Sequence, residues 1–383
     1  MAQALPAKGT VAGHVSVTFV SSYGGMGGSE IYLERLLSEI DRSLVTRVIL
    51  LGDGPLERRL RDLELTVDVV PTSRDLRSML RSSWRLRKRL LACRPGVVHA
   101  NGLKAALVAV PAVIGTRLPV LWARHDFAME GWRARILARA CSGVICVSDA
   151  LARTFRGPQL RKVSVVHTGV PEMNIERGDS RRRVLELIGD LHAEPVISLV
   201  GRLVPDKGHG ELIEITPRLL RRLPDARILI IGDAPTERFE SYVGGLRGRI
   251  EELGVGGTIT FVGHREDALM LIAGSDMVVM PSVSSHPGVE TEGFPLIALE
   301  ALGVGTPVVA YTVGGIPELL GDCGSLVPPM DTEGLLEAIE RVATDRPLWE
   351  RMSACGADRI RNRFSMADMV ARLQDAYREA ART

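Results

Sequence analysis

The chain of 383 residues has no long uninterrupted apolar run, only 4% aromatic residues and only five cysteines. No window approaches the roughly 18 consecutive apolar residues of a membrane-spanning helix, so we expect no transmembrane segment. The first 13 residues lack an apolar core, so we expect no secretory signal peptide. These absences favour a cytoplasmic protein, whose only contact with a membrane would be peripheral, at the inner face.

The cysteines are too few and too scattered to suggest a disulfide framework. Cys93, Cys141, Cys146, Cys323 and Cys355 contain no C-x-x-C pair, and their number is odd. Small secreted domains and zinc sites have paired or clustered cysteines instead. We therefore expect five buried, unpaired thiols in a reducing compartment.

Apolar residues make up 45% of the chain, which is ample for two cores, and the length favours two domains. The net charge of +2 conceals an asymmetry between the halves. Residues 1–175 carry 25 basic and 14 acidic side chains, whereas residues 176–383 carry 23 basic and 32 acidic ones. The positive excess of the first half can attract an anionic partner or a membrane surface.

Short β-rich apolar runs alternate with helical patterns along the whole chain, which is typical of parallel α/β sheets. Polar residues at about 171–194 separate two series of runs and are expected to hold the linker, and a last helix is expected from Phe364 to Ala380. The predicted strands are His14–Val20, Val45–Leu51, Thr66–Val70, Val97–His99, Val120–Ala123, Gly143–Val147 and Val163–His167, then Val196–Val200, Arg227–Ile231, Thr258–Val262, Met277–Met280, Pro307–Ala310 and Gly324–Val327. Motifs that follow these strands are expected to line one cleft, because ligands of open α/β sheets bind at the carboxyl ends of strands.

The most informative segment runs from Glu292 to Glu300 and contains Gly293, Phe294, Pro295 and Leu296. Glycine permits a ligand to approach the backbone closely, and proline suits the first turn of a helix. We therefore expect Glu292 on a loop and Glu300 inside the helix that follows. Free N–H groups at the start of that helix favour a phosphate, and the two carboxylates can accept hydrogen bonds from hydroxyl groups. This combination suits a nucleotide sugar.

The segment resembles the E-x7-E signature of the retaining family 4 glycosyltransferases, which have the GT-B fold. Pro281-Ser282, Gly305-Thr306-Pro307-Val308 and Gly314-Gly315-Ile316-Pro317-Glu318 stand around it in the order typical of that family. The resemblance covers nearly the whole chain. It implies an α/β protein with two Rossmann-like parallel-sheet domains that face a central cleft.

The same resemblance implies the domain boundaries. We expect an N-terminal acceptor-binding domain over residues 1–175 and a C-terminal donor-binding domain over residues 176–363. The last segment, residues 364–383, is expected to form a helix that crosses back to the N-terminal domain. His167-Thr168-Gly169-Val170 resembles the interdomain crossing of the family, so we expect a hinge there.

Two cations follow the predicted strand Val196–Val200. Arg202 and Lys207 stand at a strand–helix loop together with Gly201, where a guanidinium fork and an ammonium group can hold a diphosphate. A solvated loop with ordinary charges is the alternative. The resemblance implies that both cations stabilise the leaving diphosphate, and the nearby E-x7-E segment favours this interpretation.

A glycine-rich loop follows the first predicted strand. Gly25 and Gly27 lie in it, and Ser29 is a candidate helix cap. The dinucleotide pattern G-x-G-x-x-G fails here, because Glu30 stands where a glycine is required. The resemblance implies that the loop contacts the donor phosphates, and a tight turn without ligand contact is the alternative.

Two histidines also follow predicted strands. The resemblance implies that His125, next to Asp126, contacts the transferred sugar, and the alternative is that it only satisfies a local turn. His99 begins a segment that resembles the H-x-H motif of the family, with Asn101 in place of the second histidine. We expect His99 to be structural. Gly263 and His264 are expected to contact the nucleotide base, largely through the backbone.

A basic segment runs from Arg74 to Arg94. Leu76, Met79, Leu80, Leu86 and Leu90 recur in it at helical spacing, with Trp84 among the charges. One interpretation is a helix face that lies on a membrane surface. The other, which we favour from the sequence, is a solvated helix that covers a Rossmann-like domain.

These observations predict a glycosyltransferase that moves a sugar from a UDP-sugar or a related nucleotide sugar to a glycan, glycolipid or small-molecule acceptor, with retention. His125 and Glu292 would serve the transferred sugar, and Glu300 the ribose. No D-x-D motif follows a predicted strand, so we expect no metal and no cofactor, and nothing indicates nucleic-acid binding. The alternatives are a GT-B nucleotide-sugar epimerase and a non-catalytic nucleotide-sugar binding protein.

Overall fold

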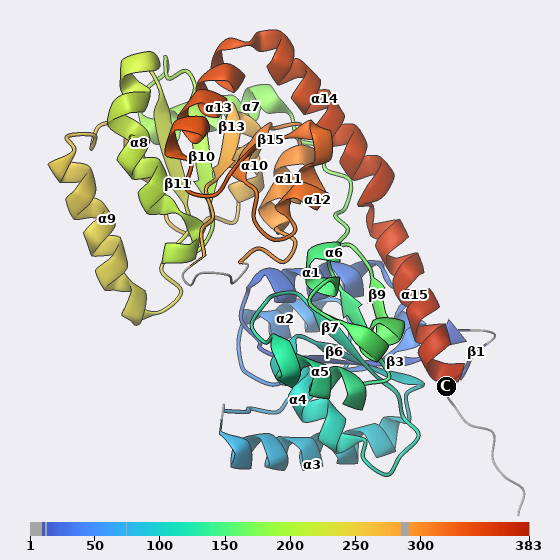
Figure 1. Ribbon diagram of the computed structural model, residues 1–383. Helices are drawn as coiled ribbons and strands as arrows, with labels where there is room; N and C mark the ends of the chain where they lie inside the picture. Colours follow the sequence, from blue (N-terminus) through green and yellow to red (C-terminus); the bar gives the residue numbers. More distant parts are fainter. Residues whose placement is uncertain (1–9, 12–13, 74, 285–290, 383) are drawn as a thin grey trace, which may run out of the picture. The chain divides into compact units, whose positions relative to one another are not determined.

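The computed structural model describes residues 10–11, 14–73, 75–284 and 291–382, and the chain divides into two compact units. Unit 1 consists of Met1–Gly169 together with Met366–Thr383, and unit 2 consists of Val170–Ser365. Each unit is built on its own parallel sheet (Figure 1). The first boundary falls inside the expected hinge motif rather than at residue 175, and the second lies just past the expected residue 363.

Unit 1 contains a seven-stranded parallel sheet with the strand order β5-β4-β3-β6-β7-β8-β9. All seven strands predicted for this half are present, and the first is split, because a short antiparallel pair of β1 (Thr10–Val11) and β2 (His14–Val15) precedes β3. The sheet strands are β3 (Val17–Ser21), β4 (Val45–Leu50), β5 (Val67–Val69), β6 (Val97–Asn101), β7 (Val120–Arg124), β8 (Gly143–Cys146) and β9 (Val163–Val165).

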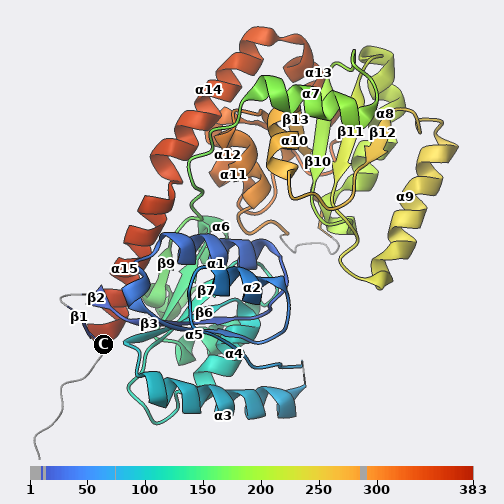
Figure 2. The same cartoon turned by 180° about the vertical axis from the view of Figure 1, so that it is seen from behind.

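Helices cover both faces of this sheet: α1, α2 and α15 lie on one side, and α3 and α4 on the other (Figures 1 and 2). The helices are α1 (Gly28–Glu39), α2 (Pro55–Asp62), α3 (Leu76–Cys93), α4 (Leu103–Ala112), α5 (Gly131–Ala140), α6 (Asp149–Ala152) and α15 (Met366–Arg382). Short 3-10 turns occupy Arg42–Leu44 and Gly157–Lys162.

The last helix belongs to unit 1 because one of its faces completes the core of that unit. Met366, Met369, Leu373 and Tyr377 recur at helical spacing and are buried against α1 and the sheet. The Tyr377 hydroxyl lies 2.9 Å from Nδ1 of His99 in β6. His99 is therefore a core residue that links α15 to the sheet.

Unit 2 contains a six-stranded parallel sheet with the strand order β12-β11-β10-β13-β14-β15. All six strands predicted for this half are present, with end shifts of a residue or so. They are β10 (Val196–Val200), β11 (Arg227–Ile231), β12 (Ile259–Phe261), β13 (Met277–Met280), β14 (Val308–Tyr311) and β15 (Ser325–Val327).

The helices of unit 2 lie between these strands in the sequence, as a doubly wound α/β fold requires. They are α7 (Arg177–Ile188), α8 (His209–Arg222), α9 (Glu240–Glu252), α10 (Ala268–Gly274), α11 (Leu296–Gly303), α12 (Ile316–Leu320), α13 (Thr332–Thr344) and α14 (Arg346–Arg363). Short 3-10 turns occupy Pro205–Lys207, Glu237–Phe239 and Gly321–Cys323. None of the helices in the described part of the chain is both long and apolar enough to span a bilayer.

Two sequence predictions need correction. The expected linker at residues 171–194 contains helix α7, which buries Ser180 and Val184 and is part of unit 2. The expectation of five free thiols is also wrong, because Cys323 and Cys355 form a disulfide with their Cα atoms 5.2 Å apart. Their separation of 32 residues gave no sign of the pairing, which the packing of α14 brings about. Cys93, Cys141 and Cys146 are free.

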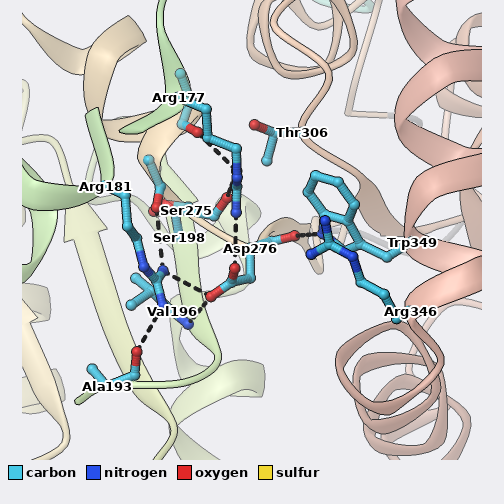
Figure 3. A network of polar contacts seen from close by, with 12 residues as sticks. Arg177, Arg181, Ala193, Val196, Ser198, Ser275, Asp276, Thr306, Arg346 and Trp349 are labelled. Carbon is cyan, nitrogen blue, oxygen red and sulfur yellow. Dashed lines mark hydrogen bonds and ion pairs between the residues drawn. The ribbon is translucent and has the colours of Figure 1, made fainter. Parts of the chain in front are cut away.

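The amino-terminal edge of the unit 2 sheet is tied together around Asp276 (Figure 3). Arg177 and Arg181 of α7 bind its carboxylate at 2.9 and 2.8 Å, and the Val196 N–H donates to it at 2.7 Å. The carbonyl oxygen of Asp276 accepts from the indole N–H of Trp349 in α14 at 2.7 Å. One residue thus connects two helices with the starts of β10 and β13.

Replacement of Asp276 by alanine is expected to lower the free energy of unfolding by about 2–3 kcal/mol, because two guanidinium groups and one N–H lose their acceptor. The partial exposure of both arginines keeps the loss below that of a fully buried pair. Urea unfolding followed by circular dichroism measures it. Asp179→Ala is the matched control, since it removes only an exposed pair with Arg182 in the same helix and should cost less than about 1 kcal/mol. Equal losses in the two variants would contradict the assignment.

Candidate functional site

The residues predicted for donor binding lie at the carboxyl edge of the unit 2 sheet. The loop after β10 carries Gly201, Arg202 and Lys207, and the segment after β13 leads to Glu292. β10 and β13 are hydrogen-bonded neighbours, so the chain segments that follow them emerge side by side. The structure therefore brings Lys207 and Glu292 together from positions 85 residues apart.

Glu292 and Lys207 form an ion pair in a buried setting. Nζ of Lys207 lies 2.6 Å from Oε1 of Glu292, and the Ser282 hydroxyl donates to the same oxygen at 2.7 Å. Burial by itself raises the pKa of Glu292, but Lys207, the Ser282 hydroxyl and the charge of Arg202 together outweigh it and hold the pKa below its usual value. The carboxylate is therefore ionised at neutral pH, although only 5% of the residue is exposed. Arg202 itself is exposed to solvent.

Two glycines permit the backbone approaches on which this arrangement depends. Gly208 has a φ of +71°, and a Cβ there would stand 1.8 Å from the carbonyl oxygen of Pro281. Gly314 has a φ of +53°, and a Cβ there would stand 1.9 Å from the carbonyl oxygen of Glu292. The neighbouring Gly315 N–H donates to that same oxygen at 2.8 Å. The Gly314-Gly315 motif therefore supports the Glu292 backbone directly.

The second glutamate lies on the helix that follows. Glu292 is on the loop and Glu300 is inside α11, which begins at Leu296 directly after Pro295. Pro295 thus precedes the first turn rather than lying within it. The ring of Phe294 packs edge-on against Phe364 with 5.3 Å between centroids. The first N–H groups of such a helix have no partner within the helix, so they remain able to bind an anion.

A cavity of about 370 Å³ opens at the ends of β11 and β12, and Leu203, next to Arg202 in the loop after β10, is part of its lining. Its lining includes Gly263, which the sequence predicts for base binding, and also Phe261 and Arg247, which it does not. The Arg247 guanidinium lies over the Phe261 ring at 5.4 Å. His264 is exposed, and its backbone N–H donates to the Asp233 carboxylate at 2.8 Å. Asp233 therefore fixes the Gly263-His264 turn through the backbone.

Unit 1 holds a second group of predicted residues, centred on Asn101. Its side-chain nitrogen donates to the Ser29 carbonyl at 2.9 Å, so its oxygen faces Nε2 of His125, 2.6 Å away. Nε2 must then carry the proton, because an amide oxygen can only accept, and this leaves Nδ1 as the acceptor of the ring. The ring of Tyr32 packs edge-on against His125 with 4.6 Å between centroids. Asn101 thus connects the glycine-rich loop to His125.

The loop that carries His125 is braced by Arg124. The buried guanidinium donates to the Thr154 hydroxyl at 2.6 Å and to the backbone carbonyls of Met129 and Asp126 at 2.6 and 3.2 Å. Asp126 does not pair with His125, and its carboxylate accepts from the Ala128 N–H at 3.0 Å. The loop is therefore held from the inside by one side chain.

The glycine-rich loop leads into α1 without the cap that the sequence predicts. Gly27 occupies the N-cap position and has no side chain that could cap the helix. The Ser29 hydroxyl donates to the Glu30 carboxylate at 2.9 Å instead. Ser29 lies two residues past the N-cap position, which Gly27 occupies, so this prediction is wrong. A side chain at Gly25 would meet no atom within 4 Å, whereas one at Gly27 would stand 2.9 Å from the Glu30 carboxylate.

His125 and His99 are both neutral at physiological pH. Burial lowers the pKa of His125 to about 4, against the opposing charge of Asp126. Burial, together with the nearby His125, lowers the pKa of His99 to about 3. At physiological pH, His125 therefore offers a neutral ring and its backbone carbonyl, and carries no positive charge.

Sequence reasoning assigned no role to Ser282, Asp233 or Arg247, and it treated Asn101 only as a departure from a motif. Ser282 belongs to a Pro-Ser pair whose place in the order of motifs carries the resemblance but indicates no role for the hydroxyl. The hydroxyl and amide partners of a carboxylate or a histidine show no periodicity in the sequence. The one available signal was position, because each of these residues except Arg247 follows a predicted strand.

Comparison with known proteins identifies the class of protein to which this fold belongs. A model described as "Glycosyltransferase Family 4" matches residues 26–172, and one described as "Glycosyl transferases group 1" matches residues 194–345. The two matches fall in unit 1 and unit 2 respectively. The paired Rossmann-like sheets are those of a GT-B glycosyltransferase, and the chain belongs to the family 4 glycosyltransferases.

Individual relatives are distant. Alpha-D-kanosaminyltransferase of Streptomyces kanamyceticus is 27% identical over 79% of this chain and 81% of its own length. D-inositol 3-phosphate glycosyltransferase of Saccharomonospora viridis is 33% identical over 56% of this chain and 50% of its own length. Among solved structures, Anabaena HepE in complex with UDP-glucose has a TM-score of 0.83 at 23% identity, and the match covers 94% of this chain and 99% of that one. Sucrose-phosphate synthase from Thermosynechococcus elongatus has a TM-score of 0.77 at 18% identity, over 95% and 98% of the two chains.

The ring of His125 is expected to stay neutral from pH 8 down to about pH 5, which histidine-selective NMR of the folded protein would show. The unfolded chain takes up this proton near pH 6.5, so the stability contributed by His125 is present above that pH and is lost as the pH falls toward about 4. Asn101→Asp is the informative variant, because a carboxylate against Nε2 should raise the pKa of His125. A wild-type His125 that titrates between about pH 6 and 7 would contradict the buried, neutral assignment.

Proposed function

We propose that this glycosyltransferase moves a sugar from a nucleotide sugar, such as a UDP-sugar, to an acceptor hydroxyl with retention at the anomeric carbon. The observation that carries the proposal is the ionised, buried Glu292, which Lys207 holds beside the start of α11. A carboxylate, a cation and free helix N–H groups in one place match the sugar hydroxyls and the diphosphate of such a donor. The retaining outcome rests on the resemblance to the family, and the uridine base rests on the solved relatives that bind UDP-glucose or UDP.

Each side chain takes a separate part of the donor in this proposal. Lys207 has three N–H groups, and only one is needed for Glu292, so the other two remain for the diphosphate. Arg202, exposed beside the pair, supplies a second cation. Both hydrogen bonds to Glu292 end on Oε1, and Oε2 would accept from a sugar hydroxyl. Glu300 would accept from the ribose hydroxyls.

The base would occupy the cavity next to Gly263. A volume of about 370 Å³ suits a nucleobase, and Phe261 and Arg247 offer a planar ring and a guanidinium against which a base can stack. In unit 1 we assign His125 to the transferred sugar, and Gly25 and Gly27 to the phosphates. The neutral ring of His125 can exchange hydrogen bonds with hydroxyls without repelling positive charge that develops on the sugar.

The chemical step needs no separate base. The acceptor oxygen forms a bond to the anomeric carbon as the bond from that carbon to the diphosphate oxygen breaks. The acceptor proton passes to the departing phosphate oxygen on the same face of the sugar. Arg202 and Lys207 stabilise the negative charge that grows on the diphosphate, so catalysis is mainly positioning and electrostatics. We propose that these two cations replace a metal ion, because no D-x-D motif follows a strand of the sequence.

The test is release of nucleoside diphosphate from a panel of nucleotide sugars, with EDTA present, on addition of glycan, glycolipid and small-molecule acceptors. Acceptor-dependent release with a retained anomeric configuration in the product is expected. Turnover of the donor to its epimer without acceptor would make the protein an epimerase, and tight binding without turnover would make it a binding protein. Loss of activity in EDTA that magnesium restores would overturn the metal-independent proposal.

Calorimetry with UDP on purified variants tests the separate roles. Lys207→Ala is expected to lower turnover by at least about 100-fold and to weaken UDP binding. Glu300→Gln should weaken UDP binding and raise KM more than it lowers kcat, whereas Glu292→Gln should lower kcat and leave UDP binding nearly unchanged. The reverse behaviour of the two glutamate variants would exchange their roles.

The double variant Lys207→Ala/Glu292→Gln separates two roles of the lysine. Lys207→Ala alone leaves an ionised carboxylate buried without its partner, so it should also destabilise the protein, by about 3–5 kcal/mol at most. The double variant should recover stability but not UDP binding. If it recovers UDP binding as well, the lysine serves only to neutralise Glu292 and does not hold the diphosphate.

A further inference from the structure

Two leucines in the second half of helix α3 are buried against unit 1, whereas those in the first half are exposed. Leu86 and Leu90 are buried, at 0% and 3% exposure. Leu76 and Leu80, which share the same apolar periodicity, are 71% and 55% exposed. In Figures 1 and 2 the helix lies on the outside of unit 1, beyond α4. Leu76 and Leu80 therefore do not pack against the domain, although they recur at the same helical spacing as Leu86 and Leu90.

The outward side of α3 consists of two adjacent stripes. Leu76, Leu80 and Trp84 recur every four residues, and Leu91 follows two turns later on the same side; Trp84 and Leu91 are 57% and 54% exposed. Ile114, at the end of α4, continues this apolar stripe, since its carbonyl accepts from Arg87 of α3 at 2.7 Å and its side chain is exposed. We call Leu76, Leu80, Trp84, Leu91 and Ile114 the apolar stripe.

The second stripe is basic. Arg77, Arg81, Arg85 and Lys88 lie next to the apolar stripe, each exposed and one turn from the next. Lys88 lies over the ring of Trp84, with Nζ 3.7 Å from its centroid. Residues 76–93 contain six basic side chains and no carboxylate.

The cations of this basic stripe are not used to hold the fold together. Arg87 and Arg89, which are only partly exposed, bind the Ala112 carbonyl at 3.0 Å and the Asp68 carboxylate at 3.0 Å. Within the described part of the chain, Arg77, Arg81 and Arg85 make no side-chain ion pair. The outer charges are therefore available to an external partner.

A cavity of about 420 Å³ lies at the carboxyl end of α3, where the apolar stripe ends. Leu90, Leu91 and Leu118 contribute apolar lining, and Arg94 and Arg117 bring positive charge to the same cavity. An apolar hollow with cations beside it has the chemistry to receive an anionic amphiphile.

We propose that the outer face of α3, with this cavity, binds the surface of a bilayer that contains anionic phospholipid. The apolar stripe would enter the boundary between headgroups and acyl chains, and the basic stripe would lie at the lipid phosphates. Charge complementarity selects this partner. A polyanion such as nucleic acid would use the arginines but leave five large apolar side chains in water, and a second copy packed face to face would bring like charges together.

The test is flotation of the full chain with vesicles of phosphatidylcholine alone or with about one third phosphatidylglycerol. Binding is expected only to the anionic vesicles, and Arg81→Glu/Arg85→Glu should lower the partition coefficient by at least about tenfold at near-physiological salt. Leu80→Ser/Trp84→Ser should lower it similarly at the same salt concentration, because the apolar stripe would no longer enter the boundary between headgroups and acyl chains. Arg221→Glu/Arg351→Glu is the matched control, since it makes the same change in net charge at exposed positions of unit 2 and should bind as wild type does.

Fluorescence quenching by brominated acyl chains shows whether the stripe enters the bilayer. Wild-type fluorescence should be quenched, and Trp84→Phe should lose that quenching while it still floats with the vesicles. Trp132→Phe, at the other highly exposed tryptophan, should keep the quenching.

Three outcomes would overturn the proposal. The first is no binding to anionic vesicles, and the second is equal loss of binding in the unit 2 control. The third is concentration-dependent dimerisation that Leu80→Ser/Trp84→Ser abolishes, with no vesicle binding, which would make the face an interface between copies. None of these measurements requires turnover, so they stand or fall independently of the proposed reaction.

Discussion

The buried ion pair between Lys207 and Glu292 is the constraint on which the proposed donor site of unit 2 depends. A carboxylate with 5% exposure would become neutral without compensation, and a neutral carboxyl would lose its attraction for Lys207. With the pair intact, two segments that are 85 residues apart in the sequence are fixed against each other at the carboxyl edge of the sheet. The glycines at 208 and 314 follow from this, because any side chain there would push the Pro281 or Glu292 backbone away. The ion pair and the close backbone contacts at the two glycines therefore depend on each other.

The same pair would allow the proposed site to hold both a carboxylate and a diphosphate, which carry charge of the same sign. Lys207 can meet both requirements, since it neutralises the charge of Glu292 and retains N–H groups that can bind a second anion. Arg202 remains exposed, so a donor that arrives would meet an unshielded guanidinium first. Unit 1 contributes no comparable charge at His125, whose ring is neutral. The proposal therefore assigns charge stabilisation to unit 2 and uncharged hydrogen bonding to unit 1.

Most of the fold could be predicted from the sequence, because buried parallel strands are short continuous apolar runs and the helices between them are longer and amphipathic. All strands such as Val196–Val200 and Met277–Met280 were found, and so was the placement of Glu292 before a helix and Glu300 within it. The partners of these residues could not be predicted. Ser282, Asp233 and Asn101 act through contacts between loops that are far apart in the chain, and hydrogen-bond partners of that kind leave no periodic signal.

The two corrected expectations about the fold and the exposed part of α3 share a physical cause. Sequence pattern indicates which residues are polar or apolar, but it does not show which surface a segment packs against or how far that surface extends. The polar sequence of segment 171–194 predicts a linker, but Val184 is buried and Arg177 and Arg181 of α7 bind Asp276, so the segment is attached to unit 2. In α3, by contrast, apolar side chains remain exposed. Leu86 and Leu90 are buried against unit 1, whereas Leu80 and Trp84 are exposed and contribute little to its stability. Exposed apolar side chains in an unbroken row beside unpaired cations are therefore not explained by the fold, and an external surface is the partner that their chemistry fits.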